Sequence, residues 1–372
     1  MQKCFALFLW LVNKIMKRKT VVWNWYPIDE IDLAKEIGFD LLPGCIITND
    51  YYDVNNANKD DFNVIIINHF FGKTIKQRTM EDLSWADLVV HYTPEIIYGP
   101  WEDYQETIIK HFNNKNFITV CNGVVDMPHY PAARVYKDAQ TFFTRVARYC
   151  PAVKLANTIV EKPIMFDALL GKKDLRRDKV FRSLKDNNLL GDNLVNYYEE
   201  QGQDATSIYR STDLYSIDDN PITGFSTYPA TPGGVPRSHM VPHEIYNRTW
   251  FSVVAETNSR TTFMTEKTAK CLLSGRMFVM LGEKGHMAKL QSYGYKTFST
   301  HIDESYDDID NEDERIRQAL AQVKLLTQRK DLGAVMTQLH ETFVHNQKKC
   351  IDNTDRLDRL RKFLLPYCVG KL

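Results

Sequence analysis

One short stretch of the sequence places an acid and a base side by side where an apolar run gives way to a helical pattern. Thr265, Glu266 and Lys267 follow a run that ends at Glu256. The first turn of a helix presents free N–H groups and the positive end of the helix dipole, which suits a diphosphate. Lys267 would add a positive charge, and the Glu266 carboxylate can accept hydrogen bonds from the two vicinal hydroxyls of a ribose. The residue types therefore fit a nucleoside diphosphate, and they equally fit a plain helix start capped by Thr265.

The segments that must position these residues alternate between strand and helix patterns. Apolar runs at 63–70 and 86–95 are buried-strand signals in the first half, and a second series begins at 161 and resumes at 246–257. Apolar runs separated by helical patterns predict parallel sheets in an α/β arrangement. We therefore expect an α/β protein with two Rossmann-like domains facing across a cleft, followed by C-terminal helices. The usual binding site of such a fold is the cleft at the carboxyl ends of the strands.

The alternation breaks around residues 125–160, and this break predicts the domain boundaries. A chain of 372 residues is also long for a single core. The expected divisions are 1–17 as a leader or alternative start, 18–160 as the N-terminal domain, 161–330 as the C-terminal domain and 331–372 as C-terminal helices.

Composition limits the classes of partner. The 47 basic and 47 acidic residues give a formal net charge of zero, which argues against non-specific nucleic-acid binding without excluding a basic cleft. The seven cysteines are scattered and form no C-x-x-C motif, so we expect reduced thiols and a cytoplasmic location, which would be the host cytoplasm for a viral protein. The apolar run at 4–12 is too short to span a bilayer, so no stable membrane insertion is expected, although a short surface helix remains an alternative.

Residues 246–282, YNRTWFSVVAETNSRTTFMTEKTAKCLLSGRMFVMLG, resemble the donor-binding segment of the α1,3-fucosyltransferases. In that family a strand ends in Glu-Asn-Ser and is followed by a spacer, Thr-Glu-Lys, a helix, a glycine and an apolar strand. The later run HIDESYDD (301–308) is similar to one found in a group of phage and viral glycosyltransferases. This chain has one extra residue between Glu256 and Asn-Ser and lacks a proline often present in the last strand, so the sugar identity does not transfer.

The resemblance implies the two-domain GT-B glycosyltransferase arrangement, with an N-terminal acceptor domain and a C-terminal nucleotide-sugar domain. It implies no bound metal and a UDP- or GDP-linked sugar as co-substrate. In this reading Glu266 contacts the ribose and Lys267 a phosphate, with Glu256 and Thr265 in the same donor-binding segment. A basic residue at the start of the second domain also meets the diphosphate in that family, and the candidates here are Arg176, Arg177 and Arg182. An arginine fork pairs two phosphate oxygens at once, but these residues also fit a solvated helix face or a DNA-backbone contact.

An inverting transfer needs a general base near the acceptor hydroxyl. In this fold the base comes from a loop after a strand of the first domain, and the candidates are His69, Glu95 and Asp50. A retaining reaction would need none of them. The one Asp-x-Asp, residues 308–310, lies in an acidic polar run and is interpreted as solvated surface rather than as a metal site.

The sequence thus predicts a metal-independent glycosyltransferase whose partners are a nucleotide sugar and an acceptor. The acceptor is either a glycan or a hydroxymethylated base in phage DNA. Two alternatives stay open: a nucleotide-sugar epimerase of the same fold, and a non-catalytic module that binds sugar or nucleic acid. An epimerase would form product from the donor alone, and a binding module would keep its function after Glu266→Ala.

Overall fold

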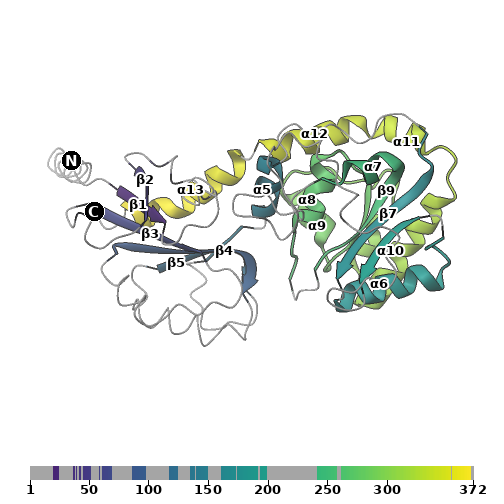
Figure 1. The fold of residues 1–372 in the computed structure, drawn as a ribbon, viewed down its shortest axis with the longest axis horizontal. Helices are drawn as coiled ribbons and strands as arrows, with labels where there is room; N and C mark the ends of the chain where they lie inside the picture. Colours follow the sequence, from purple (N-terminus) through teal and green to yellow (C-terminus); the bar gives the residue numbers. More distant parts are fainter. Residues whose placement is uncertain are drawn as a thin grey trace, which may run out of the picture. The chain divides into compact units, whose positions relative to one another are not determined.

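The chain forms two compact units, each built around one parallel sheet (Figure 1). Unit 1 comprises Met1–Ala139 and Thr354–Leu372, and unit 2 comprises Gln140–Asn353. The computed structural model describes residues 20–24, 37, 39, 42, 45–51, 58, 61–68, 86–97, 117–124, 135–138, 140–149, 161–172, 174–191, 193–198, 241–257, 261–352 and 354–369. The expected α/β class with two parallel-sheet domains is confirmed.

Unit 1 contains a six-stranded sheet with the order β2-β1-β3-β4-β5-β6, in which every neighbouring pair is parallel. The strands are β1 (Thr20–Asn24), β2 (Cys45–Tyr51), β3 (Phe62–Asn68), β4 (Leu88–Ile97), β5 (Phe117–Val124) and β6 (Val135–Lys137). The described side chains of β3 are all buried, as expected for a parallel strand covered on both faces. The long helix α13 (Thr354–Val369) belongs to this unit, because Leu360 and Leu364 are fully buried in its core.

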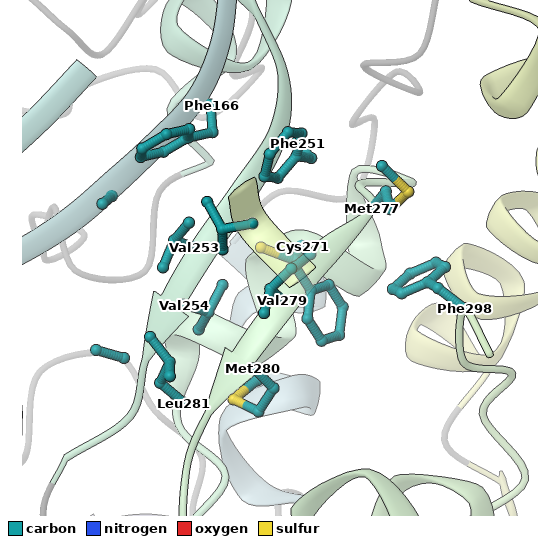
Figure 2. Close-up of a cluster of buried hydrophobic side chains, with 14 of the residues drawn as sticks. Phe166, Phe251, Val253, Val254, Cys271, Met277, Val279, Met280, Leu281 and Phe298 are labelled. Atoms are coloured by element: carbon teal, nitrogen blue, oxygen red, sulfur yellow. The ribbon is translucent and has the colours of Figure 1, made fainter. Parts of the chain in front are cut away.

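Unit 2 contains a four-stranded parallel sheet with the order β10-β9-β7-β8. The strands are β7 (Ile164–Lys172), β8 (Leu194–Tyr198), β9 (Thr249–Ala255) and β10 (Phe278–Leu281). The helical elements are α5 (Thr141–Tyr149), α6 (Leu175–Asp186), α7 (His243–Arg248), α8 (Glu266–Leu273), α9 (His286–Ser292), η5 (Glu304–Asp308), α10 (Glu312–Thr327), α11 (Leu332–Gln338) and α12 (His340–Ile351). Figure 2 shows side chains of β9 and β10 gathered around Cys271 of α8 in the apolar core.

The two units divide the chain at different points from the predicted boundaries after residues 160 and 330. Helix α5 already belongs to unit 2, where Phe143 packs edge-on against the ring of Tyr295 at 5.3 Å between centroids. The C-terminal helices also separate, since residues up to 353 stay with unit 2 while α13 returns to unit 1. There Arg356 pairs with the buried Asp138 carboxylate at 2.6 Å. The division after Ala139 therefore lies inside the break in the sequence pattern at 125–160, but before the end of that break, where the boundary was expected.

The cysteines in the described part of the chain are free thiols. Burial raises the pKa of the Cys271 and Cys350 thiols to about 12, so both side chains stay protonated and pack as small apolar groups.

A buried ion pair joins three strands of the second sheet. Arg276, just before β10, donates to the Asp167 carboxylate of β7 at 2.6 Å and to the Ser252 hydroxyl of β9 at 3.0 Å. Its guanidinium also donates to the backbone and hydroxyl oxygens of Thr249 and lies 4.8 Å from the centre of the Tyr246 ring. Asp167 in turn accepts from the hydroxyls of Thr249 and Ser252. Removing Arg276 would leave the buried Asp167 carboxylate without its direct ion-pair partner.

We therefore expect Arg276→Met to lower the free energy of unfolding by about 3–5 kcal/mol, the usual cost of breaking a buried ion pair from one side. Urea denaturation followed by tryptophan fluorescence measures this. The control is Arg182→Met, which removes an exposed arginine from α6 and should change the stability by less than about 1 kcal/mol. Equal effects of the two substitutions would contradict the assigned role of Arg276.

Candidate functional site

Three helices of unit 2 begin at one edge of its sheet (Figure 1). Helix α6 follows β7, α8 follows β9 and α9 follows β10, and the strands are parallel. Their carboxyl ends therefore lie at the same edge, which is where open α/β sheets commonly bind ligands. This edge carries Glu266 and Lys267, the acid–base pair singled out in the sequence.

Glu256 is a buried anchor for the start of α8. Its carboxylate is 1% exposed and accepts hydrogen bonds from the backbone N–H of Thr265 at 3.0 Å and from the hydroxyls of Thr265 and Thr268, both at 2.5 Å. A longer bond of 3.4 Å comes from the Thr268 N–H. Thr265 is the N-cap of α8, with its hydroxyl accepting from the Lys267 N–H at 3.3 Å. N–H groups that the sequence analysis offered to a diphosphate are therefore already bonded within the protein.

Glu266 and Lys267 remain partly accessible beside this anchor. Their side chains are 16% and 18% exposed, and the Lys267 ammonium lies 3.2 Å from the Glu266 carboxylate. The ammonium also donates to the hydroxyl of Thr265 at 3.0 Å and to that of Thr257 at 3.5 Å. The two side chains are thus held together in a defined geometry, and both still reach solvent.

Arg176 connects four segments of this edge. Its side chain is 1% exposed, and its guanidinium donates to Glu283 after β10 at 2.5 Å, to Glu312 of α10 at 2.9 Å and to the Thr257 carbonyl at 3.2 Å. Every nitrogen that can donate is therefore engaged in this structure. Arg176 bonds the backbone carbonyl of Thr257 while Lys267 bonds its hydroxyl, which makes Arg176 a positioning residue for the edge.

The other two candidate arginines lie in different surroundings. Arg177 is buried at the start of α6 and pairs with Asp174 at 3.0 Å. Gly171 lies near the end of β7, at a register shift of that strand, and has a φ of +65°. A Cβ at this position would lie 3.9 Å from a terminal nitrogen of Arg177. Arg182 is 69% exposed and pairs with Asp178 within α6 at 2.8 Å. The structure thus brings Arg176 and Arg177 to the edge and leaves Arg182 on a solvated helix face.

His286 is a residue of this edge that the sequence analysis missed. It opens α9 with no exposed surface, and its Nε2 lies 3.5 Å from the Thr268 hydroxyl. Its Nδ1 has no hydrogen-bond partner within the described part of the chain. A Cβ at Gly282 would lie 2.7 Å from this nitrogen, so a glycine is required there. Gly282 and Gly285, which both precede the start of this short helix, are the sequence signal that could have indicated it.

The acidic run at 303–308 has structural roles. Asp307 accepts from the N–H groups of Met287 and Ala288 at 2.9 and 3.2 Å and so caps α9, and Tyr306 accepts from the Met280 N–H. Asp308 and Asp310 are exposed, and Asp310 pairs with Lys284 at 2.7 Å, in agreement with their interpretation as solvated surface. Within the described ranges no group of His, Cys, Asp or Glu could hold a metal ion.

The three candidate bases of the first domain stay predictions. His69 lies outside the described residues, and the side chains of Asp50 and Glu95 do too. The backbones of Asp50 and Glu95 were expected just after strands, but these two residues lie within β2 and β4. For β4 the reason is a register irregularity between Thr93 and Ile96 that lets the strand continue past Pro94, which has no N–H to donate.

Comparison with known proteins adds little to this geometry. No protein-family model and no curated protein matches the chain. Two solved structures, "Crystal Structure of alpha1,3-Fucosyltransferase" and the same enzyme "with GDP", each align at a TM-score of 0.43, with 11% and 10% identity, over 94% of this chain and 90% of theirs. At this TM-score the similarity carries no functional assignment. No helix among the described residues is long and apolar enough to cross a membrane, and the predicted leader lies outside them.

The burial of His286 predicts a specific dependence of stability on pH. Burial lowers its pKa to about 4, with Arg176 contributing and Glu256 opposing, whereas an unfolded histidine titrates near 6.5. Between these values the unfolded state binds more protons, so stability is lost as the pH falls. We expect this residue to remove about 2 kcal/mol of unfolding free energy between pH 7 and pH 5.

Urea denaturation of the parent protein and of His286→Gln, which cannot gain a proton, measures this contribution at the two pH values. The parent should lose about 2 kcal/mol more than the variant. Equal losses would show that His286 is already charged, or accessible, in the folded state.

Proposed function

We propose that the protein is a glycosyltransferase that moves a sugar from a nucleoside-diphosphate sugar, UDP- or GDP-linked, to an acceptor hydroxyl. The observation that carries the proposal is the pair Glu266 and Lys267, held 3.2 Å apart and partly exposed at the carboxyl edge of a parallel sheet. The segment that contains this pair is also the one that resembles the fucosyltransferase donor-binding segment.

In the proposed complex Lys267 contacts the diphosphate and Glu266 accepts hydrogen bonds from the ribose hydroxyls. The ammonium of Lys267 would exchange its contact with Glu266 for phosphate oxygens, which frees that carboxylate for the sugar hydroxyls. Arg177 is the arginine we assign to the diphosphate, because it is buried at the start of α6, which directly follows the carboxyl end of β7. Glu256, Thr265 and Arg176 act indirectly by holding α8 and Thr257 in place.

The proposed reaction forms a bond between the acceptor oxygen and the anomeric carbon while the bond from that carbon to the diphosphate breaks. The electron pair leaves with the diphosphate, where Lys267 offsets the growing negative charge. If configuration inverts, the acceptor proton passes to a base in unit 1, and His69, Glu95 and Asp50 are the proposed candidates. Positioning the acceptor against the donor supplies the remaining rate enhancement.

The acceptor class is a separate part of the proposal, either a glycan or a hydroxymethylated base in phage DNA. The run at 303–308 that resembles the viral enzymes caps α9 and packs against β10, so it favours neither acceptor. Titrating DNA binding with salt separates them, because phosphate contacts release counterions and lose affinity steeply as the salt concentration rises. DNA binding that does not change with salt concentration would favour a glycan as the acceptor.

Lys267→Met tests the donor site. The substitution removes a charged hydrogen-bond donor to phosphate, which is worth about 1.5–3 kcal/mol, so the affinity for GDP or UDP should fall by about ten- to a hundredfold. Isothermal titration with each nucleotide measures it, and thermal shift follows the same loss. The melting temperature without nucleotide should also fall, because the Lys267 ammonium lies 3.8 Å from the buried Glu256 carboxylate, so nucleotide affinity measured on the folded variant is the decisive readout.

Arg182→Met is the matched control, because it removes a cation of the same unit that faces solvent. It should leave nucleotide affinity unchanged. If Lys267→Met and Arg182→Met bind the nucleotide equally well, the donor site is wrongly placed. If donor alone is converted to a new sugar nucleotide, the protein is an epimerase and the transferase proposal fails.

A further inference from the structure

We propose that a second pocket, at the amino edge of the unit 2 sheet, binds a small organic anion whose ring packs against Trp250. The pocket has a volume of about 490 Å³, which is within the usual range for small-molecule sites. Nothing in the proposed transfer reaction requires it. We call it the amino-edge pocket, and its lining residues are Glu161, Lys162, Met165, Trp250, Arg329, Lys330, Leu332 and Gly333.

The topology of the sheet separates the amino-edge pocket from the donor site. Met165 lies at the beginning of β7 and Trp250 at the beginning of β9, and the two strands are parallel neighbours. Lys267 follows the opposite ends of these strands. Residues between α10 and the start of α11 complete the wall. A ligand here and a nucleotide at α8 would therefore occupy opposite edges of one sheet.

The wall combines a ring platform with a small opposing surface. Trp250 is half-buried, and Gly333 lies beside its ring, where a Cβ would come within 3.7 Å of the ring atom Cη2. Met165 and Leu332 add apolar surface. An indole face beside apolar side chains suits the flat face of a sugar ring or a nucleobase.

Charge makes the amino-edge pocket favour an anion. It has three basic side chains against the single acid Glu161, and Asp331 neutralises Arg329 through contacts of 2.7 and 2.8 Å. Lys330 is exposed and has no ion pair with a described residue. One of the three basic side chains, Lys162, is buried, and both it and the buried Arg276 interact with the Asp167 carboxylate. The pocket and its floor thus carry a net positive charge that an anionic group would offset.

Lys162 links this charge to pH. Its ammonium donates to the carbonyls of Tyr246 and Asn247 at 2.8 and 3.1 Å, and burial next to Arg276 lowers its pKa to about 7, with Asp167 opposing. Glu161, Arg329 and Lys330 are the other charged groups that line the pocket. An anion bound beside Lys162 favours its charged form, so binding takes up a proton and weakens as the pH rises through 7.

The test uses the full-length protein with methyl-labelled methionine, because the Met165 methyl reports on the amino-edge pocket directly. The probes are glucuronate and a nucleoside monophosphate, which share an anion on a ring, with uncharged glucose as the matched ligand. We expect saturable shifts of the Met165 resonance, assigned by Met165→Leu, with at least one anion and none with glucose. The probe that binds identifies the source of the ligand, acidic sugar or nucleotide.

Lys330→Glu should weaken that binding by about tenfold, whereas Lys324→Glu, an equal charge change on an exposed lysine of α10 outside the pocket, should not. Trp250→Leu should weaken it by at least about tenfold through lost stacking. For glucuronate, whose charge is constant in this range, affinity should fall about tenfold between pH 6 and pH 8.

Three outcomes would overturn the proposal that the amino-edge pocket binds an anion. They are no Met165 shift with either anion, equal shifts with glucose, and a shift abolished by Lys267→Met but not by Lys330→Glu. The last would place the ligand at the donor site. Because Lys330 is exposed and lies outside the core, its variant gives an answer even if Trp250→Leu fails to fold. If Lys267→Met shows that the donor site is wrongly placed, the Met165 shifts expected for the amino-edge pocket do not change.

Discussion

The buried carboxylate of Glu256 is the interaction on which the carboxyl edge of the second sheet depends. A carboxylate without water is costly unless its oxygens are bonded, and here the first turn of α8 supplies those bonds. Because Glu256 directly follows β9, the same contacts fix where α8 starts relative to the strand. Glu266 and Lys267, which lie in the same turn between Thr265 and Thr268, take their position from this anchor. The helix start is thus used for architecture, and the ligand chemistry is left to side chains.

The two edges of this sheet treat charge differently. At the carboxyl edge each cation already faces carboxylates, with Arg176 between Glu283 and Glu312 and Lys267 beside Glu266. A ligand there must exchange partners, which favours a molecule that offers both an anion and hydroxyl groups. At the amino edge Lys162 and Arg276 share one carboxylate, so positive charge is in surplus. A simple anion is sufficient to balance it.

Local pattern predicted most of the elements and part of the candidate site. The apolar runs became β3, β4, β9 and β10, because strands covered on both faces need apolar side chains at nearly every position. The pattern located the first division between units only to the stretch 125–160, and it did not predict that the last helix returns to unit 1. The helix α13 has an apolar stripe that would fit either core, and only the contacts of Leu360 and Leu364 assign it to unit 1.

By itself the sequence determined the parallel α/β class, the N-cap at Thr265 and the placing of Glu266 and Lys267 in the first turn of a helix. These features depend on residues within a few positions of one another, through side-chain period and capping. The tertiary structure alone decided that Glu256 points inward, that His286 is buried and that Arg176 is engaged while Arg182 faces solvent. Their partners are distant in the chain, as Glu312 is from Arg176, and no local rule brings such residues together. Long-range packing of the sheet and its helices does so.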